Sequence, residues 1–118
     1  MIKLITLLHK RADLTREQFI ARYENGHKQI GEKYLGSHAS RYLRRYRRIM
    51  DSAILGGDEL PADVVMEIWF DDQAAFDAAM ATLSTEAAQA EIIADEEQLF
   101  DRSRMVSFVV DEYESDFT

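Results

Sequence analysis

The alternation of hydrophobic and polar positions predicts four β-strands. Residues 2–9 are apolar on both faces of the predicted strand and include β-branched side chains, which is typical of a central strand covered on both sides. Residues 64–70 and 105–110 form two further strands. Arginine and tyrosine dominate residues 41–49, where a helix would have no continuous apolar stripe, so we expect the remaining strand there.

The longest predicted helix follows the first strand and runs from Leu14 to about Leu35. Thr15 and Gln18 have the spacing of a capping box at its start. Gly36 stands where a C-cap glycine belongs. Between these two signals the apolar positions recur with helical spacing. The sequence therefore predicts one amphipathic helix with defined ends.

A second helical region follows the third strand and is interrupted once. It starts after a cap at Asp71 or Asp72, breaks at Ser84–Thr85 and continues from residue 86 to about residue 100. Residues 51–63 contain two glycines and the only proline of the chain, so we expect the longest and most flexible loop there. Residues 111–118 form an acidic tail that we expect to be frayed.

The order of the elements is strand, helix, strand, strand, helix pair, strand, which matches the split βαβ or ferredoxin-like arrangement. We predict one α+β domain over residues 1–118, with a four-stranded antiparallel sheet and all helices on one face. The other face would be uncovered in a monomer, although residues 2–9 and 64–70 are apolar on both sides. Because soluble proteins avoid large exposed apolar surfaces, we predict a homodimer that packs sheet against sheet.

Composition and charge narrow the possible functions. The chain has 118 residues, of which 47% are hydrophobic and 31% charged, as in a soluble globular domain. A formal net charge of −8 argues against general binding to nucleic acids or anionic membranes. Cysteine is absent, which excludes disulfides, thiolate nucleophiles and cysteine-bound metals. No apolar run has the length of a membrane span and the N-terminus lacks a signal-peptide pattern, so we expect a cytoplasmic protein.

The most suggestive chemical feature is a histidine on the apolar face of the first helix. Phe19, Tyr23, His27 and Ile30 recur there at helical spacing. A neutral imidazole in an apolar pocket can take a proton from an acidic carbon or hydroxyl and return it to a leaving hydroxyl. The alternative is a core histidine bonded to a nearby carbonyl or carboxylate. Tyr23 could donate a hydrogen bond to a developing enolate, or only pack.

Glu67 and the arginine-rich strand also have two interpretations each. Glu67 shares a strand face with Trp69 and could act as an acid with a raised pKa, or it could pair with an arginine of the neighbouring strand. Residues 41–48 hold five arginines and two tyrosines, which resembles a nucleic-acid surface. The acidic chain favours instead a charged edge strand that blocks unwanted strand pairing and forms ion pairs. One inward-facing arginine could also bind a substrate carboxylate.

The sequence has no signature of a bound metal or nucleotide. His9, His27 and His38 lack the close spacing of metal ligands. No phosphate loop, dinucleotide fingerprint or nucleophile elbow is present either. We therefore expect a protein that uses no cofactor.

Several segments, in their order and spacing, resemble the EthD-like family of the dimeric α+β barrel superfamily. They are Met-Ile-Lys-Leu at the start, Leu-Thr-Arg-Glu-Gln-Phe at the first helix, Tyr23 four residues before His27, Glu67-Ile68-Trp69-Phe70-Asp71, and Asp95-Glu96 ahead of Phe100-Asp101. The similarity covers nearly the whole chain. Family members often have tryptophan in place of Tyr23 and proline in place of Gln29. We therefore expect this helix to continue through Lys28 without a kink.

The resemblance implies a dimer whose two sheets form a barrel, with a small-molecule pocket between each sheet and its helices. Members and relatives include dehydratases, cyclases, isomerases and cofactor-free monooxygenases acting on aromatic or polyketide-like compounds. We therefore expect a proton-transfer enzyme with His27 as base and acid, assisted by Tyr23 and Glu67. Asp101 matches the closing aspartate of the family and would either orient His27 or cap a turn. The expected apolar pocket wall comprises Phe19, Ile30, Trp69, Phe70 and Phe100.

Two alternatives to this enzyme are open, because a fold does not settle a function. The first is a non-catalytic accessory protein that binds a small hydrophobic ligand, with His27 as an anchor or a packing residue. The second is a haem-handling or cofactor-free oxygenase relative.

Overall fold

The computed structural model describes residues 1–48 and 62–118. Its elements in chain order are β1 (Ile2–Leu8), α1 (Arg16–Arg22), the π-helical turn η1 (Tyr23–His27), α2 (Lys28–Leu35), β2 (Arg41–Tyr46), β3 (Val64–Phe70), α3 (Gln73–Leu83), α4 (Glu86–Glu96), the 3₁₀ turn η2 (Arg102–Arg104) and β4 (Val106–Val110). Most of the loop predicted at residues 51–63, and the predicted end of the second strand at residue 49, lie outside the described residues.

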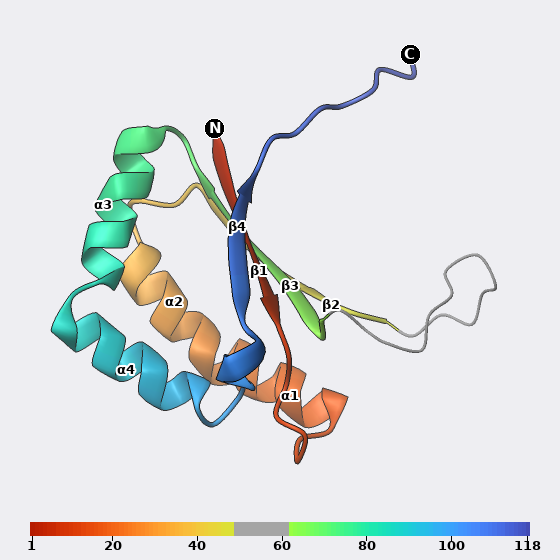
Figure 1. The fold of residues 1–118 in the computed structure, drawn as a ribbon, viewed down its shortest axis with the longest axis vertical. Helices are drawn as coiled ribbons and strands as arrows, with labels where there is room; N and C mark the ends of the chain where they lie inside the picture. Colours follow the sequence, from red (N-terminus) through yellow and green to blue (C-terminus); the bar gives the residue numbers. More distant parts are fainter. Residues whose placement is uncertain (49–61) are drawn as a thin grey trace.

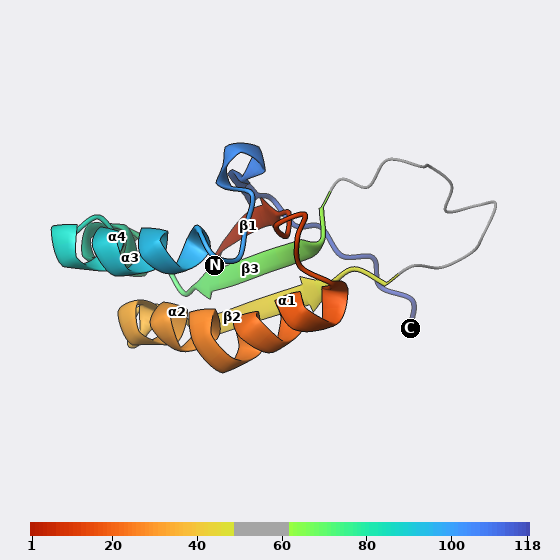
Figure 2. The same cartoon turned by 90° about the horizontal axis from the view of Figure 1, so that it is seen from below.

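The four strands form one antiparallel sheet in the order β2-β3-β1-β4. β1 is therefore central and the arginine-rich β2 is an edge strand, as predicted. The run α1-η1-α2 and the pair α3-α4 lie on one face of this sheet (Figures 1 and 2). The structure confirms the predicted α+β, ferredoxin-like architecture.

Polar caps start the helices where the sequence predicted them. Thr15 and Gln18 form a reciprocal capping box: the backbone nitrogen of Gln18 lies 3.1 Å from the Thr15 hydroxyl oxygen, and the backbone nitrogen of Thr15 lies 3.0 Å from the Gln18 side-chain oxygen. Asp72 caps α3 by accepting a hydrogen bond from the backbone of Ala75 at 2.8 Å. The side chain of Thr85 caps α4 in the same way. These bonds satisfy backbone donors that have no partner inside a helix.

The long first helix differs from the prediction in one turn. The backbone N–H of Lys28 bonds to the carbonyl of Tyr23, five residues earlier, so Tyr23–His27 form a π-helical turn. The helix continues through Lys28, as expected, but with this turn in its middle. Such turns are rare and occur frequently at functional sites.

α4 ends four residues earlier than predicted, at Glu96. The backbone of residues 99–101 instead forms hydrogen bonds with the residues that follow β1. The carbonyl of Leu99 accepts from Arg11 at 3.0 Å, and the N–H of Asp101 donates to the carbonyl of His9 at 2.9 Å. These long-range bonds compete with a further helical turn and end the helix.

The core between the sheet and the helices consists of two clusters. The first lies below α1 and η1 and contains Leu8, Leu14, Phe19, Tyr23, Val64, Leu99 and Phe100. The second lies below α2 and α3 and contains Leu35, Ile68, Phe70 and Ala79. The first cluster is the more aromatic, and it carries the predicted histidine on its rim.

No described element covers the opposite face of the sheet, which we call the open face. Three rows in register cross it from β4 to β2, and eight of their twelve side chains are apolar. The rows are Val110-Lys3-Trp69-Arg41, Phe108-Ile5-Glu67-Leu43 and Val106-Leu7-Val65-Arg45. The Phe108 residue is 41% exposed, which leaves a substantial apolar surface in contact with water.

Two glycines of the helical run provide a test of this packing. A Cβ at Gly31 would lie 2.9 Å from the Tyr42 ring, whereas a Cβ at Gly26 would meet nothing within 4 Å. We expect Gly31→Ala to lower the free energy of unfolding by about 1 kcal/mol or more. Gly26→Ala should leave it unchanged or raise it by up to about 1 kcal/mol, because alanine favours a helix. Urea unfolding measures both; equal shifts in the two variants would contradict the packing.

Candidate functional site

His27 and Asp95 form the most distinctive polar contact in the structure. Nδ1 of His27 lies 2.7 Å from Oδ2 of Asp95, which joins η1 to the end of α4. A carboxylate can only accept a hydrogen bond, so Nδ1 carries the proton. In the neutral imidazole, Nε2 then holds the free lone pair. Nε2 makes no hydrogen bond within residues 1–48 and 62–118.

Aromatic side chains surround the imidazole. The Tyr23 and Phe100 rings meet it edge to face, with centroids at 5.2 and 5.3 Å. Phe19 packs against both of these rings in turn. Only 9% of the His27 side-chain surface stays exposed, compared with 34% for Asp95. The surroundings therefore hold the ring in one orientation with limited access to water.

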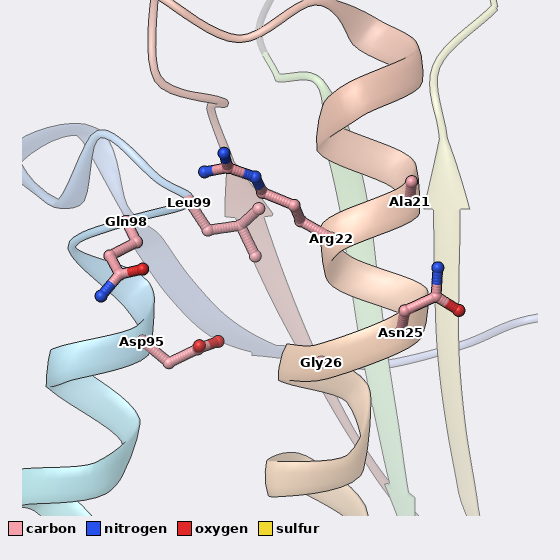
Figure 3. Close-up of a pocket in the computed structure, with 7 residues that line it drawn as sticks. All are labelled: Ala21, Arg22, Asn25, Gly26, Asp95, Gln98 and Leu99. Carbon is pink, nitrogen blue, oxygen red and sulfur yellow. The ribbon is translucent and has the colours of Figure 1, made fainter.

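A groove of about 470 Å³ runs between the α1-η1 run and the end of α4 (Figure 3). Its lining residues are Ala21, Arg22, Asn25, Gly26, Asp95, Gln98 and Leu99. The Asp95 carboxylate points across the groove towards η1, and the Arg22 side chain extends over Leu99 (Figure 3). Gly26 leaves open space where a side chain would otherwise stand. The groove thus gives access to the carboxylate that holds His27.

A second carboxyl group, that of Glu96, lies beside this pair. Glu96 is 8% exposed, and burial raises the pKa of its carboxyl, although His27 and Arg102 act in the opposite direction. Nε of Arg102 lies 3.6 Å from this carboxyl. Two neighbouring acids therefore differ in setting: Asp95 faces the groove and Glu96 faces the interior.

On its other side, η1 is tied to the edge strand β2. Glu24 accepts two hydrogen bonds of 2.8 Å from the guanidinium of Arg44 and one of 2.5 Å from the hydroxyl of Tyr46. The Arg44 hydrogen bonds are the main reason why the pKa of Glu24 falls to about 2. The hydroxyl groups of Tyr23 and Tyr42 lie 3.0 Å apart, and burial raises the pKa of both. These contacts place Tyr23 in a closed packing network, which is the alternative that the sequence left open.

Glu67 does not lie near His27. It is on the open face, where it pairs with Arg45 and accepts a hydrogen bond of 2.7 Å from Nε1 of Trp69. Burial alone would raise the pKa of Glu67, but these two donors bring it below its ordinary value. The expectation of an acid with a raised pKa is therefore wrong, and the predicted pairing with a strand-two arginine is correct. Trp69 belongs to the same face and not to a wall around His27.

Asp101 does not orient His27 either. Its carboxylate accepts hydrogen bonds from the backbone and hydroxyl of Ser103 at 3.2 and 2.6 Å, and these bonds lower its pKa. It thus caps η2, the second of its two predicted roles. The carboxylate opposite the imidazole is instead that of Asp95, which lies in the last turn of α4.

Three of the remaining predicted wall residues divide between the two core clusters, and Ile30 belongs to neither. Phe19 and Phe100 lie beside His27 in the first cluster. Phe70 belongs to the second cluster and packs against Phe76 with centroids 5.4 Å apart. Ile30 is half-buried on α2, one turn after His27. The structure therefore brings together Phe19, Tyr23, His27 and Phe100. It separates them from Phe70 in the second cluster and from Glu67 and Trp69 on the open face.

Sequence reasoning missed Asp95 and Glu96 as site residues. Both were visible within the segment Asp95-Glu96 that resembles the family, but helical spacing alone gives no reason to pair them with His27. Within the described ranges, no group of three or more histidine, aspartate and glutamate side chains is placed to hold a metal ion. None of the described helices has the length and apolarity needed to cross a bilayer.

Comparison with known proteins identifies the family. The EthD domain model matches residues 11–103, so the chain belongs to the EthD family. No curated protein matches it significantly.

Three solved structures illustrate the likeness. An EthD family protein from Bacillus halodurans C-125 is 19% identical, with a TM-score of 0.63 over 96% of this chain and 99% of that one. HapK from Hahella chejuensis is 14% identical, with a TM-score of 0.61 over 100% and 98% of the two chains. An Arabidopsis thaliana protein is 10% identical, with a TM-score of 0.61 over 99% and 100%. At these identities the likeness concerns the fold alone.

The Glu24 network predicts a pH dependence of stability. The folded-state pKa of about 2 lies below the ordinary value of 4.5, so the ion pair stabilises the fold fully above pH 4.5. This contribution is lost as the pH falls from 4.5 towards 2. We expect Glu24→Gln to lower the free energy of unfolding by about 1–2 kcal/mol at pH 7, after allowance for partial exposure. The variant should also lose less stability than the wild-type protein as the pH falls below 4.5.

Urea unfolding between pH 7 and pH 2.5 measures this effect. Glu97→Gln is the matched control, since Glu97 is exposed and its side chain makes no ion pair with a described residue. A Glu24→Gln variant with the stability of the control at pH 7 would contradict the assigned network.

Proposed function

We propose that the protein is a cofactor-independent enzyme that moves a proton on a small oxygenated compound of the aromatic or polyketide-like class. One observation carries the proposal: a nearly buried imidazole whose Nδ1 lies 2.7 Å from the carboxylate of Asp95. Hydrogen bonding to a carboxylate fixes the tautomer and the orientation of an imidazole. The family, in which such chemistry is expected, supports the same class.

In the proposed step, Nε2 of His27 removes a proton from a carbon next to a substrate carbonyl. The electron pair of the C–H bond moves onto the carbonyl oxygen, which becomes an enolate. Asp95 stabilises the imidazolium that forms. The proton then returns to another carbon, as in an isomerase or cyclase, or to a leaving hydroxyl, as in a dehydratase or other lyase.

The groove lies on the Asp95 side of the pair, and His27 is not among its lining residues, so the proposed step requires the substrate to reach the imidazole past Asp95 and Gly26. Arg22 makes no ion pair with a described residue and its side chain extends over Leu99 (Figure 3), so its guanidinium is available to an enolate oxygen. The Gln98 amide on the facing side can bind a second oxygen. Gly26 keeps the wall beside Asp95 open. A substrate in this groove would contact α1, η1 and α4 at once.

A second candidate function is binding without catalysis. It is favoured by the small exposed fraction of His27 and the larger exposure of Asp95, because the groove then presents a carboxylate to the ligand while the imidazole stays behind it. In that case Asp95 would anchor a ligand donor and His27 would support Asp95.

Substitutions of His27 and Asp95 distinguish catalysis from binding without catalysis. We expect His27→Gln to lower proton exchange at carbon by about 10²–10⁴-fold, and Asp95→Asn to lower it substantially, because the tautomer of His27 is no longer fixed. The assay follows deuterium uptake from D₂O by mass spectrometry in a panel of aromatic and polyketide-like ketones. His38→Gln is the control, since His38 contacts Thr82 and lies outside this site.

The groove can be tested without touching the pair. Gly26→Leu should fill the groove and abolish exchange, whereas Ala90→Leu, on an exposed position of α4, should not. Ligand binding that survives in His27→Gln without any exchange in the wild-type protein would favour the binding function. Full exchange in both His27→Gln and Asp95→Asn would refute the enzyme proposal.

We also propose that the protein acts as a homodimer joined at the open face. The support is the apolar character of that face, eight of whose twelve side chains are hydrophobic. A second copy would cover this surface by symmetry, with each copy providing the same patch. The grooves lie among the helices on the other side of each sheet and would stay accessible.

Two neighbours on β4 test the homodimer. Phe108 points to the open face and is 41% exposed, while Val109 points to the other side of the strand and is 54% exposed. We expect Phe108→Glu to shift the protein towards monomers, because it places a charge in an apolar interface. Val109→Glu should leave the dimer intact. Light scattering after gel filtration measures both; an equal response of the two variants would contradict the assigned interface.

A further inference from the structure

Residues 111–118, which we call the arm, leave the sheet after β4 and stand away from the domain (Figure 1). Their start is held in place: Val110 pairs with Lys3 across β1 and β4, and Nζ of Lys3 lies 2.6 Å from the carboxylate of Glu112. Beyond this ion pair the arm is extended, and Tyr113 and Phe117 are each 96% exposed. Two large aromatic side chains thus stand in water, and Tyr113 lies at the border of the uncovered apolar face.

The arm is also strongly charged. Four of its eight residues are acidic, none is basic, and two of the remaining four are aromatic. Aromatic side chains dominate the energy of interfaces, and alternating acidic residues keep such a segment soluble while it is free. This composition is typical of a segment that binds a surface that is both apolar and basic.

The open face is such a surface. Its charged side chains are Lys3, Arg41, Arg45 and Glu67. Lys3 already pairs with Glu112 and Arg45 with Glu67, which leaves Arg41 as the uncompensated cation of this face. Arg41 stacks on the Trp69 ring at 4.7 Å and makes no ion pair with a described carboxylate. The charges of the arm and of the open face are therefore complementary.

The arm does not use the face of its own chain. A hollow of about 400 Å³ separates the two, lined by Lys3, Arg45, Glu67 and Trp69 on the sheet side and by residues 112–114 on the arm side. Within the chain, only the root of the arm is anchored, through Glu112. Tyr113 and Phe117 remain exposed, although the arm leaves the sheet from Val110, which belongs to a row of the open face.

We propose that the arm clasps a second copy of this chain. Tyr113 and Phe117 pack onto the partner, and the acidic side chains of the arm pair with the cations of its open face, Arg41 in particular. This inference rests on the proposed homodimer, whose two-fold symmetry would give two such arms per dimer. The hollow between each arm and its own sheet is then the space that the partner enters.

Dilution experiments test the energetic contribution of the arm. We expect a chain ending at Val110, and the double variant Tyr113→Ser with Phe117→Ser, to raise the dimer dissociation constant at least tenfold in sedimentation velocity. Ser115→Ala is the control and should leave it unchanged. The full chain should also lose more affinity in 0.5 M NaCl than the shortened one, because screening weakens exposed ion pairs.

The outcomes distinguish a failure of the arm proposal from a failure of the homodimer proposal. A shortened chain that dimerises as tightly as the full one would contradict the proposed contact between the arm and the partner, but not the proposed homodimer. A full chain that stays monomeric at all concentrations would overturn both.

Cross-linking tests whether the arm contacts the partner or its own chain. A photoreactive benzoylphenylalanine replaces Tyr113, and ¹⁴N-labelled and ¹⁵N-labelled chains are mixed before irradiation. Mass spectrometry then distinguishes links between chains from links within one chain. Peptides of mixed label that join the arm to the open face are the expected result. Links confined to the chain's own Lys3, Arg45 and Trp69 region would overturn the proposal.

Discussion

The hydrogen bond between His27 and Asp95 is the constraint on which the candidate site depends. It joins η1 to the end of α4, two segments that are separated by 68 residues in the chain and both lie on the helical side of the sheet. Without Asp95, no described side chain would fix the tautomer of His27. Asp95 lies in the last turn of α4, so the packing of this helix against η1 decides whether the contact can form.

The turn that carries His27 is held from two sides. Asp95 binds it from α4, and the pairing of Glu24 with Arg44 binds it from β2. Between these two contacts, the Tyr23 ring packs edge to face against Phe19 and Phe100. A π-helical turn with few such contacts would be free to revert to α-helical bonding, so the surrounding contacts stabilise the unusual backbone. This preorganisation is what a proton-transfer site requires, since the reacting group must be in place before the substrate arrives.

Periodicity predicted most of the fold, because caps, apolar stripes and strand alternation are local signals. It identified the capping box at Thr15, the break before α4 and the edge position of β2. The candidate site was less predictable. His27 was recognised from its place on an apolar helix face, but Asp95 and Glu67 depend on which strand face and which helix end meet in space. The π-helical turn was not predicted, because the spacing of Phe19, Tyr23, His27 and Ile30 also fits a regular α-helix.

The protonation of the His27 ring tests the central claim most directly. Multiple-bond ¹H–¹⁵N correlation spectra of histidine-labelled protein distinguish the two tautomers of a neutral imidazole, and a His27→Gln spectrum assigns the signals against those of His9 and His38. The structure requires a proton on Nδ1 of neutral His27 and a change of this signal in Asp95→Asn. A neutral ring with its proton on Nε2, unaltered by Asp95→Asn, would contradict the pairing and with it the proposed site.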